Sequence, residues 1–312
     1  MIEKCQLKVT IMIPTYNQAA FISKAIDSAL AQTYPNLEII VGDDASNDAT
    51  SAIAAKINDP RFKYVQNDVN VGRTANYRNL LYNHATGDYV VNLDGDDYYT
   101  DPDFISEAVK IIDANQDVVM VVGKATITSP KNENISKIPE CKTATGMQIL
   151  KRIPDNKYSF MHMAVLYSRK PALEIDFYRS SAISSDWESL YRLSLHGVVN
   201  YLDRNVGVWR QHDTNETKTT DMLKLLDNLR IWAPIYEDAT IFGMNKWHAK
   251  IICACCVANY ASSSCIKFSR ADQKMLVKFI LLVVNEFRFP SIFFVVYPKY
   301  GARILLSLLG YY

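Results

Sequence analysis

The first 127 residues alternate short apolar runs with segments of helical period, and this alternation restricts the chain to few folds. The predicted strands cover 7–13, 37–42, 61–66, 88–93 and about 117–127. The predicted helices cover 18–32, 47–57, 74–85 and about 102–114. Strands separated by helices of this length form βαβ units. We therefore predict an α/β fold with a mostly parallel central sheet and helices on both of its faces.

Polar clusters follow the last apolar residue of three predicted strands. They are residues 14–17, the pair Asp43-Asp44 and the acidic run 94–97. In an open parallel sheet, ligands bind outside the carboxyl ends of the strands. Carboxylates on such loops suit a hard cation such as Mg²⁺ or Mn²⁺, which prefers oxygen ligands. The pattern predicts a site for a metal ion and a phosphorylated ligand at this edge.

Several classes of protein are excluded by what the sequence lacks. It has no Walker motif for a phosphate-binding loop, and no G-x-G-x-x-G follows the first predicted strand. The chain has 34 Lys+Arg and 33 Asp+Glu, a net charge of +1. Proteins that track nucleic-acid phosphates carry a clear basic excess, so we expect no nucleic-acid partner.

The six cysteines favour a reducing compartment. They are not evenly paired, and residues 1–16 do not resemble a secretory signal. Cys253 and Cys256 form a C-x-x-C, but no second Cys/His pair follows at zinc-site spacing. We expect them in the core of an apolar helix and expect the protein in the cytoplasm.

The second half of the chain has weaker signals. We expect a loop or lid over 130–145, a strand over 161–169 and a helix over 184–197. Two short strands are predicted at 198–203 and 206–212. After about 218 helical periods dominate. The predicted domains are therefore 1–218, with a nucleotide-binding half at about 1–127 and an acceptor half at about 128–218, and a helical region at 219–312.

Four segments together resemble the family 2 inverting glycosyltransferases of the GT-A fold. They read IPTYNQAAF, IIVGDDASNDAT, NVGRTANYRNLL and VVNLDGDDYYTDPDF. The resemblance is strong over 7–125 and weaker over 155–215, and the combination is far more specific than a lone D-x-D. It implies a GT-A fold, a UDP-sugar donor and a Mn²⁺ or Mg²⁺ cofactor.

The resemblance also implies a nucleotide-sugar site. Tyr16 would offer its ring to the uracil, and Asp44 would accept the imide N–H. One or more of Arg73, Asn76 and Arg78 would face the base or the diphosphate. The full set is Pro14, Thr15, Tyr16, Asn17, Asp44, Arg73, Asn76, Arg78, Asp94, Gly95, Asp96, Arg210 and His212.

The D-x-D element of the family corresponds to Asp94-Gly95-Asp96. One carboxylate would face the ribose or sugar, and Asp96 would face the metal, with Asp97 as a further candidate ligand. Residues 208–212 resemble the late R-x-H segment of the family. His212 would therefore lie near the diphosphate or the metal.

The catalytic base is implied by an acidic pair that the family carries at the start of a helix. Here the pair reads Ser185-Asp186, so the first acid is replaced and Asp186 remains. A carboxylate at a helix N-terminus is stabilised as the anion, which a general base must be. Asp186 would take the proton of an acceptor hydroxyl while the donor sugar inverts; the alternative is a simple first-turn Asp.

The function implied is transfer of a sugar from a UDP-sugar to a hydroxyl of a glycan, such as a lipid-linked precursor of a bacterial surface polysaccharide. Two alternatives stay open. A nucleotidyltransferase would share the metal and the nucleotide, but PTYNQAAF lacks the Gly-rich basic loop that it needs. A non-catalytic nucleotide-sugar-binding module would keep the pocket without turnover.

The C-terminal third combines apolar stretches with basic residues. Between 278 and 303 it holds four basic residues and one acidic residue. No uninterrupted run is long enough for a transmembrane helix. Two interpretations stay open for 219–312: a helical cap or homo-oligomer contact, and peripheral attachment to the inner face of the cell membrane.

Overall fold

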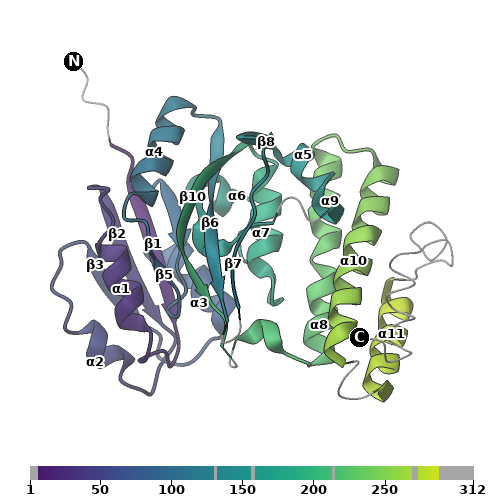
Figure 1. The fold of residues 1–312 in the computed structure, drawn as a ribbon, viewed down its shortest axis with the longest axis horizontal. Coiled ribbons are helices and arrows are strands. Elements are labelled where there is room, and N and C mark those ends of the chain that lie inside the picture. The colour runs from purple at the N-terminus through teal and green to yellow at the C-terminus, as the bar shows by residue number, and fades with distance from the viewer. Residues whose placement is uncertain (1–5, 130–131, 156–158, 213–214, 269–272, 288–312) are drawn as a thin grey trace. The chain divides into compact units, whose positions relative to one another are not determined.

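The computed structural model describes residues 6–129, 132–155, 159–212, 215–268 and 273–287 (Figure 1). The strands are β1 (Val9–Thr15), β2 (Leu37–Asp43), β3 (Phe62–Gln66), β4 (Tyr89–Asn92), β5 (Tyr98–Tyr99), β6 (Val118–Thr128), β7 (Glu133–Ile135), β8 (Thr143–Thr145), β9 (Val165–Ser168) and β10 (Val198–Arg210). The α-helices are α1 (Ile22–Leu30), α2 (Thr50–Ala54), α3 (Arg73–Asn79), α4 (Phe104–Ala114), α5 (Gly146–Leu150), α6 (Arg169–Glu174), α7 (Ser185–Ser194), α8 (Met222–Arg230), α9 (Trp232–Ile241), α10 (Lys246–Phe268) and α11 (Gln273–Phe287).

The chain forms two compact units. The first comprises 1–152, 156–181 and 185–212, and the second comprises 153–155, 182–184 and 213–312. All the strands described above belong to the first unit.

One sheet forms the centre of the first unit. Its strand order is β3-β2-β1-β4-β9-β6-β10-β5, and β7 and β8 pair with β6 and β10. The strands β3, β2, β1 and β4 are parallel neighbours, and β6 is parallel to β10. The shorter strands β5, β7, β8 and β9 run antiparallel. The predicted α/β fold with a mostly parallel sheet is confirmed.

Helices cover both faces of this sheet (Figure 1). On one face, apolar residues of α1 and α4 join a core with Ile11, Ile39 and Val91. On the other face, Asn76 of α3 donates to the carbonyl of Gly42, 2.8 Å away. A Cβ at Gly42 would lie 2.6 Å from the side chain of Leu80, so glycine permits this close packing.

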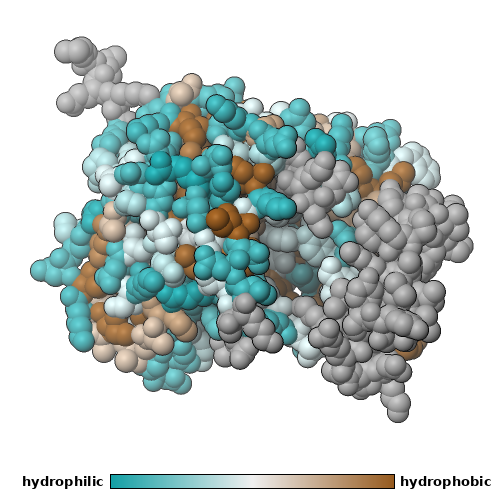
Figure 2. All heavy atoms as spheres, viewed as in Figure 1, coloured by the Kyte–Doolittle hydropathy of each residue, from teal (hydrophilic) through white to brown (hydrophobic). Residues whose placement is uncertain are grey.

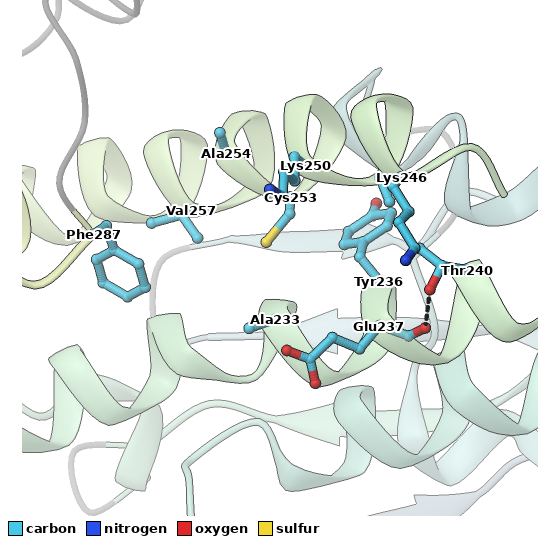
Figure 3. Close-up of a pocket in the computed structure, with 11 residues that line it drawn as sticks. Ala233, Tyr236, Glu237, Thr240, Lys246, Lys250, Cys253, Ala254, Val257 and Phe287 are labelled. Atoms are coloured by element: carbon cyan, nitrogen blue, oxygen red, sulfur yellow. Dashed lines mark hydrogen bonds between the residues drawn. The ribbon is translucent and has the colours of Figure 1, made fainter.

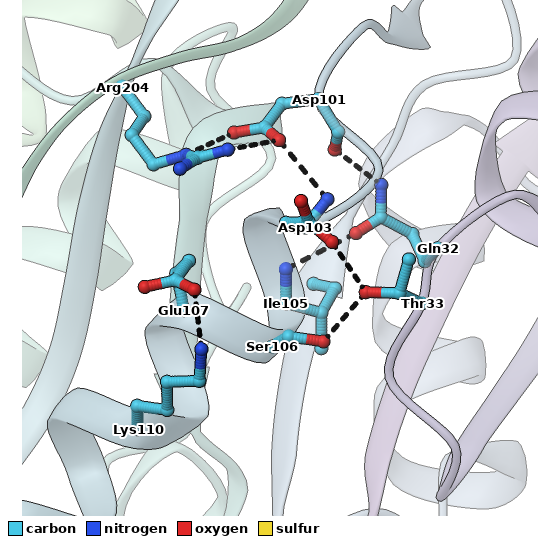
Figure 4. Close-up of polar contacts among 9 residues, drawn as sticks. All are labelled: Gln32, Thr33, Asp101, Asp103, Ile105, Ser106, Glu107, Lys110 and Arg204. Carbon is cyan, nitrogen blue, oxygen red and sulfur yellow. Dashed lines mark hydrogen bonds and ion pairs between the residues drawn. The ribbon is translucent and has the colours of Figure 1, made fainter.

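A polar network ties α1, α4 and β10 together just beyond the acidic run (Figure 4). Buried Gln32, two residues after α1, donates to the carbonyl of Asp101 and accepts from the amide of Ile105. Arg204 of β10 donates twice to the Asp101 carboxylate, at 2.5 and 2.7 Å. This guanidinium lowers the pKa of Asp101. The network fixes the segment that leads out of residues 94–97.

Two predictions for the second half are wrong. Residues 198–210 form one strand, whose register against β6 shifts between Tyr201 and Gly207 instead of breaking. The segment 130–145 contains β7 and β8, which gain strand geometry by pairing antiparallel with β6 and β10. Both features depend on partners distant in sequence, which local pattern does not reveal.

The helices α8 to α11 belong to the second unit. Cys253 and Cys256 lie on α10, where burial raises the pKa of the Cys253 thiol to about 12. No helix within the described ranges is long and apolar enough to cross a lipid bilayer. Residues 288–312, which carry most of the basic C-terminal stretch, lie outside the described residues.

Candidate active site

The three polar clusters meet at the carboxyl edge of β1, β2 and β4. Thr15 of β1 is the register partner of Asp43 of β2. The amide of Asp44 donates to the carbonyl of Thr15, and the amide of Gly95 donates to the carbonyl of Pro14. The loops after three neighbouring strands are thus joined by backbone hydrogen bonds.

Asp44 organises one side of this edge. Its carboxylate accepts hydrogen bonds from the backbone amides of Val71 and Gly72 and from the side-chain amide of Asn67, all at 2.8–2.9 Å. The residue is 2% exposed. A carboxylate has about four acceptor positions, so one remains for a ligand N–H. Gly72 has φ 91°, a conformation that favours glycine at the start of α3.

The loop after β1 presents an aromatic ring beside Asp44. Tyr16 is 46% exposed, which leaves a ring face available to a planar ligand. Asn17 adopts φ 52° and accepts from the amide of Asn47, while its own amide donates to Ser46. These contacts hold the loops after β1 and β2 against each other.

The carboxylates of residues 94–97 have three different environments. Asp94 accepts from the hydroxyl of Tyr77 at 2.6 Å and from the amide of Asn92 at 2.9 Å. Asp96 lies 2.7 Å from Nε2 of His212. Asp97 is 2% exposed and accepts from the backbone amide of Arg210. Asp97 therefore connects the acidic run to the end of β10.

Burial and mutual repulsion raise the pKa of two of these carboxylates. For Asp96, burial is the largest cause and the charge of Asp94 adds to it, against the contact with His212. For Asp97, burial again leads, followed by Asp96 and Asp94. Burial and neighbouring negative charges raise the free energy of an ionised carboxylate. A bound cation would lower it again.

The end of β10 adds a basic and aromatic group. The ring of His212 stacks on Phe21, with centroids 5.5 Å apart. The guanidinium of Arg210 lies over the rings of Phe21 and Tyr98, at 5.3 and 4.6 Å. Phe21, just before α1, was expected only as an apolar helix position, and the sequence carries no signal of its contact with His212.

The three predicted residues of α3 face different surroundings. Asn76 is buried and bonds to Gly42 and Asn67. Arg78 pairs with Asp176 at 2.6 Å and donates to the carbonyl of Phe177. Arg73 lies over the ring of Tyr77 at 5.6 Å and lowers the pKa of His162 by its charge. Of the three, Arg73 is the one whose charge acts on Tyr77, the residue that donates to Asp94.

The start of α7 lies beside the start of α3. The hydroxyl of Ser185 is 3.2 Å from that of Thr74. The charges of Asp186 and Asp94 both raise the pKa of Tyr77 and both act on His162. The structure therefore brings Asp186 into the electrostatic neighbourhood of the acidic run, from a position 92 residues later in the chain.

Sequence reasoning missed His162, on which the charges of both carboxylates act. Its Nε2 is 2.7 Å from the hydroxyl of Tyr178, and its Nδ1 is 3.4 Å from the amide of Asn92. Burial lowers the pKa of His162, although Asp186 and Asp94 act in the opposite direction. Tyr178 itself adopts φ 59°, a strained conformation held by its surroundings. Burial therefore favours the neutral imidazole of His162.

We expect His162→Phe to lower the free energy of unfolding by about 1–3 kcal/mol, because it leaves the buried hydroxyl of Tyr178 without this partner. Tyr178→Phe removes the same hydrogen bond, so the double variant should lose less than the sum of the two. Urea denaturation measures all three variants. His248→Phe, on an exposed position of α10, is the control. If the losses of the two single variants add up to the loss of the double variant, His162 and Tyr178 are not coupled.

The donor set fits a divalent cation that also binds a diphosphate. Within the described ranges, no group of three His, Cys, Asp or Glu side chains could hold a metal by itself. Asp96 and His212, 2.7 Å apart, would supply one oxygen and one nitrogen ligand. Mn²⁺ or Mg²⁺ takes its remaining positions from phosphate and water, so two protein ligands are sufficient.

Several relatives of known sequence are named glycosyltransferases. The profile of "Glycosyl transferase family 2" matches residues 10–174. An uncharacterized glycosyltransferase of Rickettsia typhi is 38% identical over 228 residues, covering 64% of this chain and 70% of the relative. GlyA of Streptococcus pneumoniae is 34% identical over 196 residues, which are 62% of this chain and 26% of GlyA. The chain spans 65% of the length of uncharacterized mycobacterial relatives that are 27% identical to it.

Solved structures show the same fold. Residues 1–349 of Staphylococcus aureus TarS, in complex with UDP-GlcNAc, match with a TM-score of 0.70 and 18% identity over 97% of this chain and 89% of that one. A mannosyltransferase of Pyrobaculum calidifontis with GDP-Man and Mn²⁺ matches with a TM-score of 0.57 and 17% identity, over 98% and 87%. The fold is GT-A, and the chain belongs to glycosyltransferase family 2.

Proposed function

We propose that this glycosyltransferase transfers a sugar from a UDP-sugar to a hydroxyl of a glycan, with inversion at the anomeric carbon and Asp186 as general base. One observation carries the proposal. Asp94 and Asp186 come from different parts of the chain, yet α3 contacts both regions: Tyr77 donates to Asp94 at 2.6 Å, and Thr74 lies 3.2 Å from Ser185, the neighbour of Asp186. We infer that Asp94 serves the donor and Asp186 the acceptor, on either side of α3.

The donor assignment depends on Asp44 and Tyr16. The exposed ring of Tyr16 suits a base, and the free acceptor position of Asp44 suits the N–H of a uracil imide. TarS structures with UDP and UDP-GlcNAc support this choice by analogy. The mannosyltransferase with GDP-Man makes a guanine nucleotide the competing donor.

The chemistry follows from where charge develops. As the sugar–phosphate bond breaks, negative charge grows on the diphosphate, and we infer that Arg73 and Arg210 are the cations that stabilise it. A divalent ion held by Asp96 and His212, with Asp97 as a further candidate ligand, would supply additional positive charge for the leaving diphosphate. Asp186 accepts the proton of the attacking hydroxyl on the opposite side of the sugar. One displacement therefore inverts the anomeric centre without a covalent sugar–enzyme intermediate.

Two other functions remain candidates, and Asp186 distinguishes both of them from a glycosyltransferase. In a nucleotidyltransferase the acceptor attacks phosphorus, and the reaction does not need a base at the start of α7. A non-catalytic binding module would have no need of Asp186 either. Retention of Asp186 beside Ser185 and Thr74 favours the transferase.

We propose a lipid-linked precursor of a surface polysaccharide as the acceptor, at the cytoplasmic face of the cell membrane. The succinoglycan biosynthesis protein ExoO of Rhizobium meliloti is 31% identical over 172 residues, 52% of this chain and 48% of that protein. Its name supports the polysaccharide class. Homo-oligomer formation through 219–312 stays a prediction.

We expect calorimetry to detect UDP binding that depends on Mn²⁺ and is lost with EDTA, with GDP and CMP binding at least about tenfold more weakly. Asp96→Asn should weaken Mn²⁺-dependent UDP binding by about tenfold or more, because it removes one of two protein ligands. Asp117→Asn, an exposed carboxylate just before β6, is the matched control. Preference for GDP would overturn the donor assignment, and unchanged binding by Asp96→Asn would overturn the metal assignment.

A further inference from the structure

Four large apolar side chains are exposed around the turn between α9 and α10. Ile241 is 80% exposed, Phe242 45%, Trp247 75% and Ile251 49%. Trp247 and Ile251 are four residues apart on α10, so they share one face of the helix. Hydrophobic atoms are visible near this end of α10 in Figure 2. We define residues 241–251 as the tip.

The charge of the tip is entirely basic. The exposed Lys246 and Lys250 flank Trp247, and the ammonium of Lys250 lies 5.7 Å from its ring centroid. The sequence from 239 to 268 contains no Asp or Glu. The nearest acids along the chain are Glu237 and Asp238, on the last turns of α9.

A groove runs from the tip along α9 and α10 (Figure 3). Its volume is about 430 Å³, and Lys246 and Thr240 lie at the end near the turn. Val257, Ala254 and Phe287 make its other end apolar, and Glu237 of α9 lines the groove between the two ends. The basic end of the groove therefore adjoins the tip, and its apolar end lies farther along α10.

We propose that the tip is a docking surface for an anionic lipid bilayer. Trp places an amphipathic ring at the level of the lipid headgroups, and Lys extends its ammonium to the phosphates. Anionic lipids attract a basic surface, and the lack of acids between 239 and 268 complements that charge. A second copy is disfavoured as the occupant, since a symmetric contact would bring the same lysines together. The inference extends the proposed function by naming the surface that meets the membrane.

The test uses the full chain and flotation with vesicles of phosphatidylcholine, alone or with about 30% phosphatidylglycerol. Wild-type protein should bind the anionic vesicles and bind the neutral ones far more weakly. Trp247→Ser/Ile251→Ser and Lys246→Glu/Lys250→Glu should each weaken anionic binding by about tenfold or more. Leu223→Ser, which removes a 67% exposed apolar side chain of α8, is the matched control and should bind as wild type.

UDP calorimetry on the same variants separates this inference from the proposed function. Unchanged UDP affinity with lost vesicle binding supports the tip and shows that the variants are folded. Absence of vesicle binding in the wild type would overturn the inference and leave the glycosyltransferase proposal intact. Undiminished vesicle binding by both double variants, or a wild-type dimer that the variants dissociate, would also overturn it.

Discussion

Asp186→Asn is expected to slow sugar transfer by about three orders of magnitude while UDP affinity changes by less than about twofold. General-base catalysis contributes roughly 10²–10⁴ in rate, and an amide of the same shape cannot accept the proton. UDP affinity should persist because Asp44, Tyr16 and the acidic run belong to other elements. The hydroxyl contact of the neighbouring Ser185 with Thr74 does not involve the Asp186 side chain, so α7 should keep its place.

UDP release from a panel of UDP-sugars measures the rate, with membrane extract as the source of acceptor. Water can replace the acceptor, so slow hydrolysis of the donor gives a second rate that should fall as well. Asp203→Asn is the control, because the side chain of Asp203 is 80% exposed on β10. Equal losses of transfer and UDP affinity would contradict the base assignment, and unchanged transfer would remove Asp186 from the mechanism.

The sequence predicts the strands and helices of residues 1–127 well because their signals are local. Strands such as β1 are buried at every position, so they appear as continuous apolar runs, and their ends are marked by Pro or Asp. The parallel topology then brings residues 14–17, 43–44 and 94–97 to one edge without any further information. For these loops, position along the chain was sufficient.

The rest of the site depends on contacts that no local pattern encodes. His162 contacts Asn92 across 70 positions, and His212 contacts Asp96 across 116. A single histidine in an apolar segment has the same appearance whether it lies in a core or beside two carboxylates. The continuous β10 was missed for a similar reason, since its irregular middle is held by Arg204 and Asp101.

Glu188 is a buried carboxylate of α7, and its ion pairs help to hold this helix in place. Its side chain is 1% exposed and pairs with Arg179 at 2.9 Å and with Arg192 at 3.3 Å. Burial raises the pKa of Glu188, and the two guanidinium groups oppose this only in part. Arg192 is itself 5% exposed and donates to the carbonyl of Ile175. The cluster thus joins the helix of Asp186 to the segment that carries Tyr178.

Glu188→Ala should therefore lower the free energy of unfolding by about 3–5 kcal/mol. The loss comes chiefly from Arg192, which stays buried without its carboxylate partner, since removing one member of a buried pair strands the other charge. Glu188→Leu/Arg192→Met should recover much of the stability, limited by the carbonyl of Ile175 that loses its donor. Glu107→Ala, which breaks the exposed pair with Lys110 on α4, should cost less than about 1 kcal/mol. Urea denaturation of the three variants and the wild type measures these losses. Similar losses for Glu188→Ala and Glu107→Ala would mean that water reaches Arg192 and that the cluster does not hold α7 in place.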